Sequence, residues 1–520
     1  MKIKNLLTVY FMFLGFNFVK ANNNEEWSYD DPRWDEYIPN WWDEENFVSP
    51  VGPSEEFHKS FWENRGQHLL HQKITSKVNT NKAKNLIIMV GDGMGLSTTM
   101  AARSYISDVS HELAFEKFPH TGMSKVYCVN YQVPESGCTA TAFLTGIKNN
   151  FSVLGLTADV NLRNCSASKN REFQIDSIFK YAQDAGKSTG FVTTTRVTHA
   201  TPAAAYAISA SRYWEGNERT PVGCSDIAHQ LIHGRIGRKF EVVLGGGRRY
   251  FEPTSNGGRR TDGRNLINEY MEIQRQNRQR AAVVFARDHL NAIETNRTDR
   301  LFGIFSDSHM EYKLLANQEL QPSLTEMTAK ALEMLQKNQK NGFVLLVEGG
   351  RIDTSHHQNR ARLALEEVVE FNKAVEYVKN NTNEAETLIL VTADHSHPFT
   401  IGGYLPRNRN ILGPGDWSIE DQMWIFSAMY GQGQGNVEHT AENGFRKNPR
   451  GMNYMAASFR QPAAVPMDEG THSGEDVGVY ASGPWSHLFT GVYEQNFIAH
   501  AMMYATCLGP SDYLKNPNCR

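Results

Sequence analysis

The chain has 520 residues, of which 40% are hydrophobic and 21% are charged, the composition of a globular protein with enough apolar material for a large core. Its formal net charge of −4 argues against a strongly basic surface for nucleic acid or anionic lipid. This length fits one large α/β domain that carries insertions.

The N-terminus has the segmentation of a secretory signal, which we expect to span residues 1–21. Lys2 and Lys4 precede an apolar stretch from Leu6 to Val19, and a small residue, Ala21, follows. The alternative is an N-terminal anchor, but the stretch is short for a membrane span. The chain's polar C-terminal segment lacks the hydrophobic tail of a lipid-anchor signal. We therefore expect a secreted, extracellular protein with no membrane span.

Six cysteines fit an oxidising compartment, although sequence alone does not fix their connectivity. The preferred pairs are Cys165 with Cys224 and Cys507 with Cys519. This choice leaves Cys128 and Cys138 free. Triplets for N-glycosylation, which also agree with secretion, begin at Asn150, Asn164, Asn296 and Asn380.

Residues 22–55 form an acidic, tryptophan-rich extension that includes Trp27, Trp34, Trp41 and Trp42. This segment is either a docking arm or an extension that folds over a neighbouring subunit. We expect residues 56–520 to form the catalytic domain.

From about residue 82, short apolar runs each end in a glycine-rich or polar cluster. These runs are Leu86–Val90, Gly190–Val192, Val242–Leu244, Phe343–Val347 and Leu388–Val391. Continuous apolar strands are typical of parallel sheets that are covered on both faces. Between the runs, Ser323 and Glu326 predict a helical capping box, and apolar residues from Ala361 to Val378 follow helical spacing. The sequence therefore predicts an α/β fold with a central, mostly parallel sheet flanked by helices.

Residues 402–470 lack this alternation of apolar runs and helical patterns. The stretch Gly431–Gly435 alternates glycine with glutamine, and an Asn-, Arg- and Pro-rich segment follows it. We interpret residues 402–470 as a surface insertion.

Side chains that bind metals follow several of the apolar runs, where an open α/β sheet places its ligands. The glycine turn 91–95 is weak evidence alone. Asp353 and His357 are spaced so that they share one face of a helix, as metal ligands or as a surface pair. The cluster 394–397, Asp-His-Ser-His, favours ligands because of its density of metal-binding side chains. His472 is ambiguous by itself.

Together these motifs resemble those of animal alkaline phosphatases, in the same order along the chain. The strings are Gly91-Asp92-Gly93-Met94-Gly95, Val133-Pro134-Glu135-Ser136-Gly137-Cys138-Thr139-Ala140-Thr141-Ala142, Glu348-Gly349-Gly350-Arg351-Ile352-Asp353, Thr392-Ala393-Asp394-His395-Ser396-His397 and Thr471-His472. The resemblance implies an alkaline phosphatase-like fold with residues 402–470 as a crown-like insertion. It also implies hydrolysis of phosphate monoesters at alkaline pH through a phosphorylated Ser136.

The resemblance further implies a site with two zinc ions and one magnesium ion per subunit. The first zinc would be held by Asp353, His357 and His472. The second would be held by Asp92, Asp394 and His395, and the magnesium by Asp92, Thr201 and Glu348. Arg212 matches the arginine that clamps phosphate, and His199 and His397 are the other expected substrate contacts.

These roles agree with the chemistry of phosphoryl transfer. Zinc lowers the cost of ionising a serine hydroxyl, and an arginine fork grips two equatorial oxygens of the transferred group. The resemblance implies no calcium site, because Ser306 and Gln321 stand where animal members of the family have acidic calcium ligands. The resemblance suggests a homodimer with residues 402–470 at the contact.

Three positions depart from the family pattern. Glu135 stands where the family usually has Asp, and its longer side chain can shift Arg212 and weaken phosphate affinity. Cys138 stands where Gly is common. Thr354 stands where vertebrate members often have His.

Other functions fit the sequence less well. A sulfatase needs Cys or Ser followed by Pro and Arg, and a serine esterase needs a Gly-x-Ser-x-Gly elbow, neither of which surrounds Ser136. A phosphodiesterase is an open alternative, although Arg212 favours a terminal phosphate. The non-enzymatic alternative is a secreted binding protein that has kept the scaffold and lost turnover.

Overall fold

The computed structural model describes residues 52–418, 420–510, 513 and 516–519. The expected signal segment and nearly all of the tryptophan-rich extension lie outside these residues. The helices are α2 (Lys59–Thr75), α3 (Leu96–Ile106), α4 (Ser136–Thr145), α5 (Cys165–Ser168), α6 (Ile178–Asp184), α7 (Ala200–Ala204), α8 (Ile227–His233), α9 (Leu266–Gln276), α10 (Arg287–Asn291), α11 (Leu324–Leu335), α12 (Arg351–His357), α13 (Ala361–Asn380), α14 (Gly435–His439) and α15 (Phe497–Thr506).

The strands form one large sheet and two small ones. They are β1 (Asn85–Gly91), β2 (His120–Lys125), β3 (Ser188–Arg196), β4 (Val242–Gly246), β5 (Ala281–Val284), β6 (Arg300–Ile304), β7 (Phe343–Gly349), β8 (Thr387–Thr392), β9 (Phe399–Ile401), β10 (Pro414–Ser418), β11 (Met423–Phe426), β12 (Ala428–Gln432), β13 (Ala463–Val465), β14 (Val477–Ser482) and β15 (Gly491–Glu494). The large sheet has ten strands in the order β15-β2-β14-β8-β1-β7-β3-β4-β6-β5. It is parallel except at β14, which runs antiparallel to both of its neighbours.

The five apolar runs of the sequence become β1, β3, β4, β7 and β8, which lie together in the middle of this sheet. Alternate residues of β1 enter different cores: Leu86, Ile88 and Val90 pack on one face, and Ile87 and Met89 on the other. Helices including α4, α7 and α15 line the first core, and α3, α11 and α13 line the second. The prediction of a mostly parallel sheet covered on both faces is confirmed.

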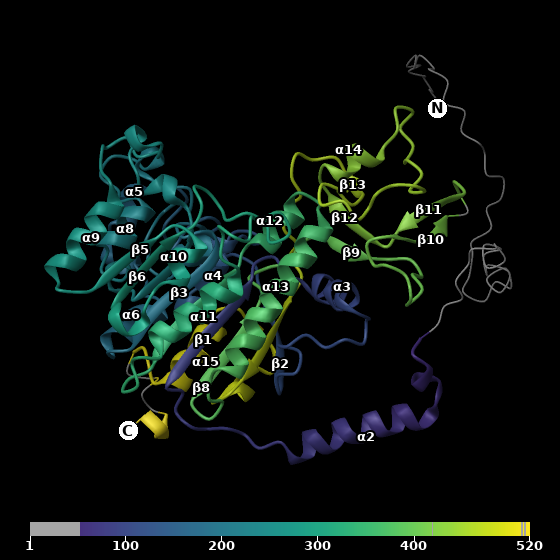
Figure 1. The fold of residues 1–520 in the computed structure, drawn as a ribbon, viewed down its shortest axis with the longest axis horizontal. Coiled ribbons are helices and arrows are strands. Elements are labelled where there is room, and N and C mark those ends of the chain that lie inside the picture. Colours follow the sequence, from purple (N-terminus) through teal and green to yellow (C-terminus); the bar gives the residue numbers. More distant parts are fainter. Residues whose placement is uncertain (1–51, 419, 511–512, 514–515, 520) are drawn as a thin grey trace, which may run out of the picture. The chain divides into compact units, whose positions relative to one another are not determined.

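Local signals also set the ends of several helices. Ser323 and Glu326 form the predicted capping box at the start of α11, and α13 follows the predicted apolar spacing. Residues 402–470 contain the β10–β11 hairpin, α14, β12 and β13, and β12 pairs with β9 and β13 in a separate three-stranded sheet (Figure 1). No helix of the described residues is both long and apolar enough to cross a membrane.

Candidate metal centre

The first group of expected zinc ligands converges beyond the carboxyl end of β7. Asp353 and His357 lie one turn apart on α12, and His357 Nε2 is 3.2 Å from Asp353 Oδ1. His472 Nε2 lies 3.0 Å from His357 Nε2 and 3.3 Å from Asp353 Oδ1. Atoms about 2.0–2.1 Å from a tetrahedral zinc are about 3.3–3.4 Å apart. The spacing of these three atoms therefore suits one shared cation.

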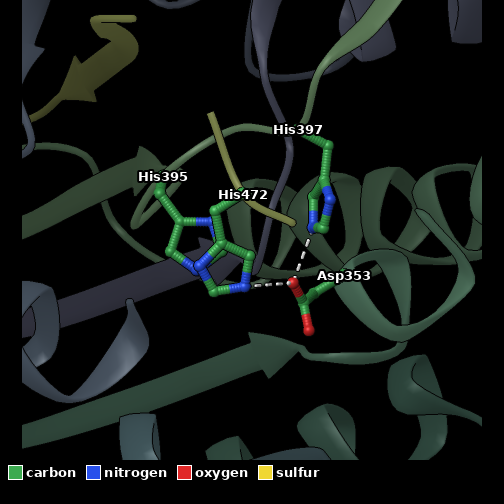
Figure 2. A group of neighbouring side chains, drawn as sticks. All are labelled: Asp353, His395, His397 and His472. Atoms are coloured by element: carbon green, nitrogen blue, oxygen red, sulfur yellow. Dashed lines mark hydrogen bonds and ion pairs between the residues drawn. The ribbon is translucent and has the colours of Figure 1, made fainter. Parts of the chain in front are cut away.

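Backbone pairing brings His472 to this position. Ser473 donates its N–H to the Ser396 carbonyl at 3.0 Å, so the two histidine-bearing loops lie side by side. Figure 2 shows the result: the His395 and His472 rings stack with centroids 3.6 Å apart, and Asp353 lies beside them. Gly93 has a φ of 72°, and a Cβ there would lie 2.8 Å from His397, so this turn requires glycine.

His397, an expected substrate contact, lies against the first group of ligands. Its Nε2 lies 2.6 Å from Asp353 Oδ1 (Figure 2). Its Nδ1 lies 3.1 Å from the Thr471 carbonyl. Both ring nitrogens therefore face protein atoms. This arrangement favours a role for His397 in orienting the Asp353 carboxylate.

The second group surrounds the expected nucleophile. Ser136 is the first residue of α4, and its Oγ lies 3.3 Å from His395 Nε2. The same His395 nitrogen is 3.2 Å from Asp394 Oδ2 and 3.6 Å from Asp92 Oδ1. Gly93 N–H donates to Asp394 Oδ1 at 3.0 Å, which fixes that carboxylate against the turn after β1. The structure thus brings Asp92, Asp394, His395 and Ser136 together.

The third group consists of Asp92, Glu348, Thr201 and His199. Ligand atoms of Asp92, His199 and Glu348 lie within 4.8 Å of one another. Thr195 Oγ1 donates to Glu348 Oε2 at 3.0 Å, which orients that carboxylate at the end of β7. Glu348 Oε1, Thr201 Oγ1 and His199 Nδ1 are buried and have no hydrogen-bond partner among the residues that the structure describes.

The charge of this centre calls for cations. Four carboxylates, those of Asp92, Glu348, Asp353 and Asp394, are buried in one region, and both Asp92 oxygens lack a hydrogen-bond partner in the described part of the chain. Burial and the neighbouring Asp394 and Asp353 carboxylates raise the pKa of Asp92 well above its ordinary value. Burial also raises the pKa of Glu348 to about 7. Bound divalent cations would balance this charge and satisfy the orphaned oxygens, so the donor set fits metal ions.

Arg212 contacts Glu135, the residue before Ser136. Its Nη1 donates to Glu135 Oε2 at 2.6 Å, and its Nη2 lies 2.8 Å from His199 Nε2. Burial opposes the charged form of Arg212, but the Glu135 carboxylate more than offsets this and raises the arginine pKa. The longer side chain of Glu135 therefore keeps a direct contact with the arginine.

A neighbouring polar network, centred on Arg196, has no motif in the sequence. Arg196 makes a bidentate contact with Glu215, with both distances 2.7 Å, and Thr198 Oγ1 donates to the same carboxylate. Arg196 also contacts His309, whose ring lies 5.2 Å from that of His199. Arg196 follows the apolar run Gly190–Val192 and ends β3, and this position at a strand end is the one feature of the sequence that indicates a place near the site. Its partners come from distant loops that show no motif.

The cysteines are paired differently from the sequence expectation in one respect. Disulfides join Cys165 to Cys224 and Cys507 to Cys519, as preferred, but a third joins Cys128 to Cys138. The expectation that these two cysteines are free is wrong. The turn before α4 brings their Cα atoms to 5.7 Å, within disulfide reach, which sequence separation could not reveal.

The expected glycosylation sites differ in accessibility. Asn164, Asn296 and Asn380 are exposed. Asn150 is only 5% exposed, and its Nδ2 donates to the Ala158 carbonyl at 2.7 Å and to the Val160 carbonyl at 3.1 Å. Its amide nitrogen is thus engaged within the fold.

Ser306 and Gln321, the two positions behind the expectation of no calcium site, contact protein atoms. Gln321 exchanges hydrogen bonds with the backbone of Glu311 at 2.8 and 2.9 Å. The Ser306 carbonyl accepts the N–H groups of Gly247 and Arg248.

Comparison with known proteins gives one consistent family. The family model described as alkaline phosphatase matches residues 83–508. The tissue-nonspecific alkaline phosphatase of Gallus gallus is 42% identical over 483 residues, covering 88% of this chain and 91% of its own. The membrane-bound alkaline phosphatase of Bombyx mori is 39% identical, covering 88% and 87%. A solved variant of the TAB5 alkaline phosphatase, with Mg bound in its M3 site, superposes with a TM-score of 0.58 at 22% identity, covering 83% of this chain and 100% of its own.

Proposed function

The chain belongs to the alkaline phosphatase family and is a hydrolase of phosphate monoesters, and we propose that Ser136 is its nucleophile and that two zinc ions and one magnesium ion serve the reaction. One observation carries this proposal. The Asp353–His357–His472 group and the Asp92–Asp394–His395 group meet where the His395 and His472 rings stack, and Ser136 Oγ lies 3.3 Å from His395 Nε2.

The proposed metal ligands follow the three groups. Asp353, His357 and His472 would hold one zinc, and Asp92, Asp394 and His395 the other. Asp92, Glu348 and Thr201 would hold magnesium, with His199 at its edge. Zinc bound in these positions would favour the ionised Ser136 hydroxyl and stabilise the oxygen that leaves phosphorus.

The chain's own residues then carry out two successive displacements. Ser136 Oγ forms a bond to phosphorus as the bond from phosphorus to the substrate alcohol breaks, and the alcohol leaves with a proton. Water next attacks the phosphoserine, the bond from Oγ to phosphorus breaks, a proton from that water returns to Oγ, and inorganic phosphate departs. Arg212 donates to the equatorial oxygens in both steps, where negative charge is spread. Glu135 and His199 hold the guanidinium in place for this role.

We further propose a secreted glycoprotein that acts as a homodimer. The composition of residues 1–21 supports secretion, and the exposed Asn164, Asn296 and Asn380 are the favoured glycan sites. We assign residues 402–470, with their separate small sheets, to the subunit contact. We do not propose a glycan on Asn150, because its amide is buried.

The test is turnover of p-nitrophenyl phosphate by the purified full chain, with metal content measured by mass spectrometry. We expect two zinc ions and one magnesium ion per subunit, activity that a chelator removes, and loss of turnover in Ser136→Ala without loss of zinc. Acid quenching with a 32P-labelled substrate should trap label on Ser136. A metal-replete protein without turnover, or Ser136→Ala with wild-type activity, would refute the proposal.

A further inference from the structure

The disulfide between Cys128 and Cys138 closes the loop that carries Glu135 and Ser136. Cys128 follows β2, and Cys138 is the third residue of α4. The two cysteines are 1% and 2% exposed, so the bond lies inside the protein rather than on its surface. It therefore joins the start of this loop covalently to the helix that begins with Ser136.

The backbone of Cys138 takes part in holding the Glu135 carboxylate. Glu135 Oε1 accepts the N–H of Cys138 at 2.8 Å and that of Ser152 at 2.7 Å. Glu135 Oε2 accepts the N–H of Gly137 at 2.9 Å and Arg212 Nη1 at 2.6 Å. Four donors therefore fix this carboxylate, and the residue that supplies one of them is anchored by the disulfide.

Arg212 depends on the same small assembly. Its backbone N–H donates to the Ser152 carbonyl at 2.9 Å, while its guanidinium contacts the Glu135 carboxylate. Ser152 in turn donates its own N–H to Glu135. A displacement of Glu135 would therefore move the guanidinium fork relative to Ser136.

Several apolar side chains of this loop are largely exposed. Val129, Tyr131 and Val133 are 52%, 55% and 42% exposed. Other anchors of the loop include the hydrogen bonds from Val129 N–H to the Asn149 carbonyl and between His472 Nδ1 and the Pro134 carbonyl. Pro134 is buried, and the Tyr131 ring packs against Phe151 with centroids 4.6 Å apart, so the disulfide adds a covalent link to a small set of non-covalent contacts.

We propose that the Cys128–Cys138 disulfide is a positioning element for phosphate binding, which acts by fixing Glu135 and, through it, Arg212. This inference rests on the proposed role of Arg212 as the phosphate clamp. Breaking the bond loosens the Cys138 amide and the Glu135 carboxylate, so the guanidinium loses its fixed direction. The loss falls on affinity for phosphate and substrate more than on kcat.

The experiment compares the full-length Cys128→Ala/Cys138→Ala double variant with wild type and with Cys507→Ala/Cys519→Ala, a matched control at the C-terminal disulfide. Inorganic phosphate is the probe, measured by calorimetry and as a competitive inhibitor. We expect its Kd and the substrate KM to rise about 5- to 10-fold in the first variant, with kcat changing about 2-fold or less. The control should bind phosphate like wild type.

A double-mutant cycle separates positioning from general stability. If the disulfide acts through Glu135, removing it from Glu135→Gln should add little to the loss of phosphate affinity. Wild-type phosphate affinity in the disulfide double variant would overturn the inference. So would a combined variant whose fold-loss of phosphate affinity equals the product of the losses from Glu135→Gln and from disulfide removal. Should the alanine variant fold poorly, as judged by Tm and zinc content, Cys128→Ser/Cys138→Gly provides the same test.

The outcomes also separate this inference from the proposed function. A wild-type protein that binds phosphate but shows no turnover would count against the proposed function alone, because the affinity comparison would still be valid. A wild-type protein that turns over substrate, with a double variant that binds phosphate normally, would count against the disulfide's role alone.

Discussion

Glu135 Oε2 accepts a hydrogen bond from Arg212 Nη1 at 2.6 Å while the same carboxylate caps the first turn of α4. One side chain therefore connects the helix of the expected nucleophile with the expected phosphate clamp. The carboxylate is buried and the arginine side chain is only 13% exposed, so solvent screens their attraction weakly.

Glu135→Gln should weaken phosphate binding. The amide keeps the shape of the side chain but removes the negative charge that holds Arg212, so we expect Kd for inorganic phosphate to rise about 10-fold, equivalent to about 1.4 kcal/mol. Isothermal titration calorimetry measures this directly. Glu135→Asp, which keeps the charge, should retain more affinity than the amide, and the opposite ranking would contradict the electrostatic account.

Removal of the metals should make stability fall as the pH rises from 7 to 9. Without cations, the pKa of Glu348 is raised to about 7 by burial, and the pKa of His357 reaches about 9 because Asp353 outweighs burial. Each folded-state pKa exceeds its unfolded value, so stability is lost as the pH rises from the unfolded to the folded value. For Glu348 this loss is nearly complete by pH 7, whereas for His357 it extends up to about pH 9, so His357 accounts for the fall between pH 7 and 9. Buried His395 and His397, whose pKa values are lowered, are already neutral in this window.

Differential scanning fluorimetry of chelated and metal-loaded protein across pH 7–9 tests this prediction. The Tm of the chelated protein should fall more steeply with pH than that of the loaded protein. Parallel curves would show that the buried carboxylates are not balanced by metal.

Tyr430→Phe should destabilise the helix that carries Asp353 and His357. The Tyr430 hydroxyl lies 2.8 Å from His356 Nδ1, and Thr98 Oγ1 lies 3.0 Å from the other ring nitrogen. Loss of the hydroxyl leaves a buried nitrogen without its partner, at a cost of about 1–3 kcal/mol in the free energy of unfolding. A lower Tm and faster zinc loss on dialysis are the expected readouts. Tyr404→Phe, at a position 81% exposed, is the matched control and should behave like wild type.

Glu367→Gln should stabilise the protein at alkaline pH. Burial raises the pKa of Glu367 to about 7, so its ionisation in the folded state costs roughly 3 kcal/mol above that pH. Glutamine keeps an acceptor for the Lys313 N–H, which donates to Glu367 at 2.6 Å. We expect a higher Tm than wild type at pH 8.5 and a smaller difference at pH 5. Glu376→Gln, on the exposed face of the same helix, should change Tm little at either pH.

Much of the fold and of the candidate site could be predicted because its signals are local. The apolar run Leu86–Val90 contains enough information to indicate a buried strand, and a strand end indicates where ligands gather. The spacing of Asp353 and His357 likewise indicates one helical face. These features depend on residues close together in the chain.

The remaining features depend on contacts between distant segments. Cys128 and Cys138 pair because the turn before α4 brings them together, and Asn150 is buried because Ala158 and Val160 fold back over it. Arg196 meets Glu215 and His309 across separate loops. No periodicity or motif at these positions indicates which distant residue each of them contacts.

The order of strands in the large sheet has a consequence for how the metal centre arises during folding. Asp92 follows β1, Asp353 follows β7, Asp394 follows β8, and His472 precedes β14, so each proposed metal site draws its ligands from segments far apart in the chain. Such long-range pairing is slow to form, and a chain that has assembled only its N-terminal half cannot retain a cation tightly. Metal binding should therefore come late on the folding pathway and stabilise a sheet whose strands have already paired.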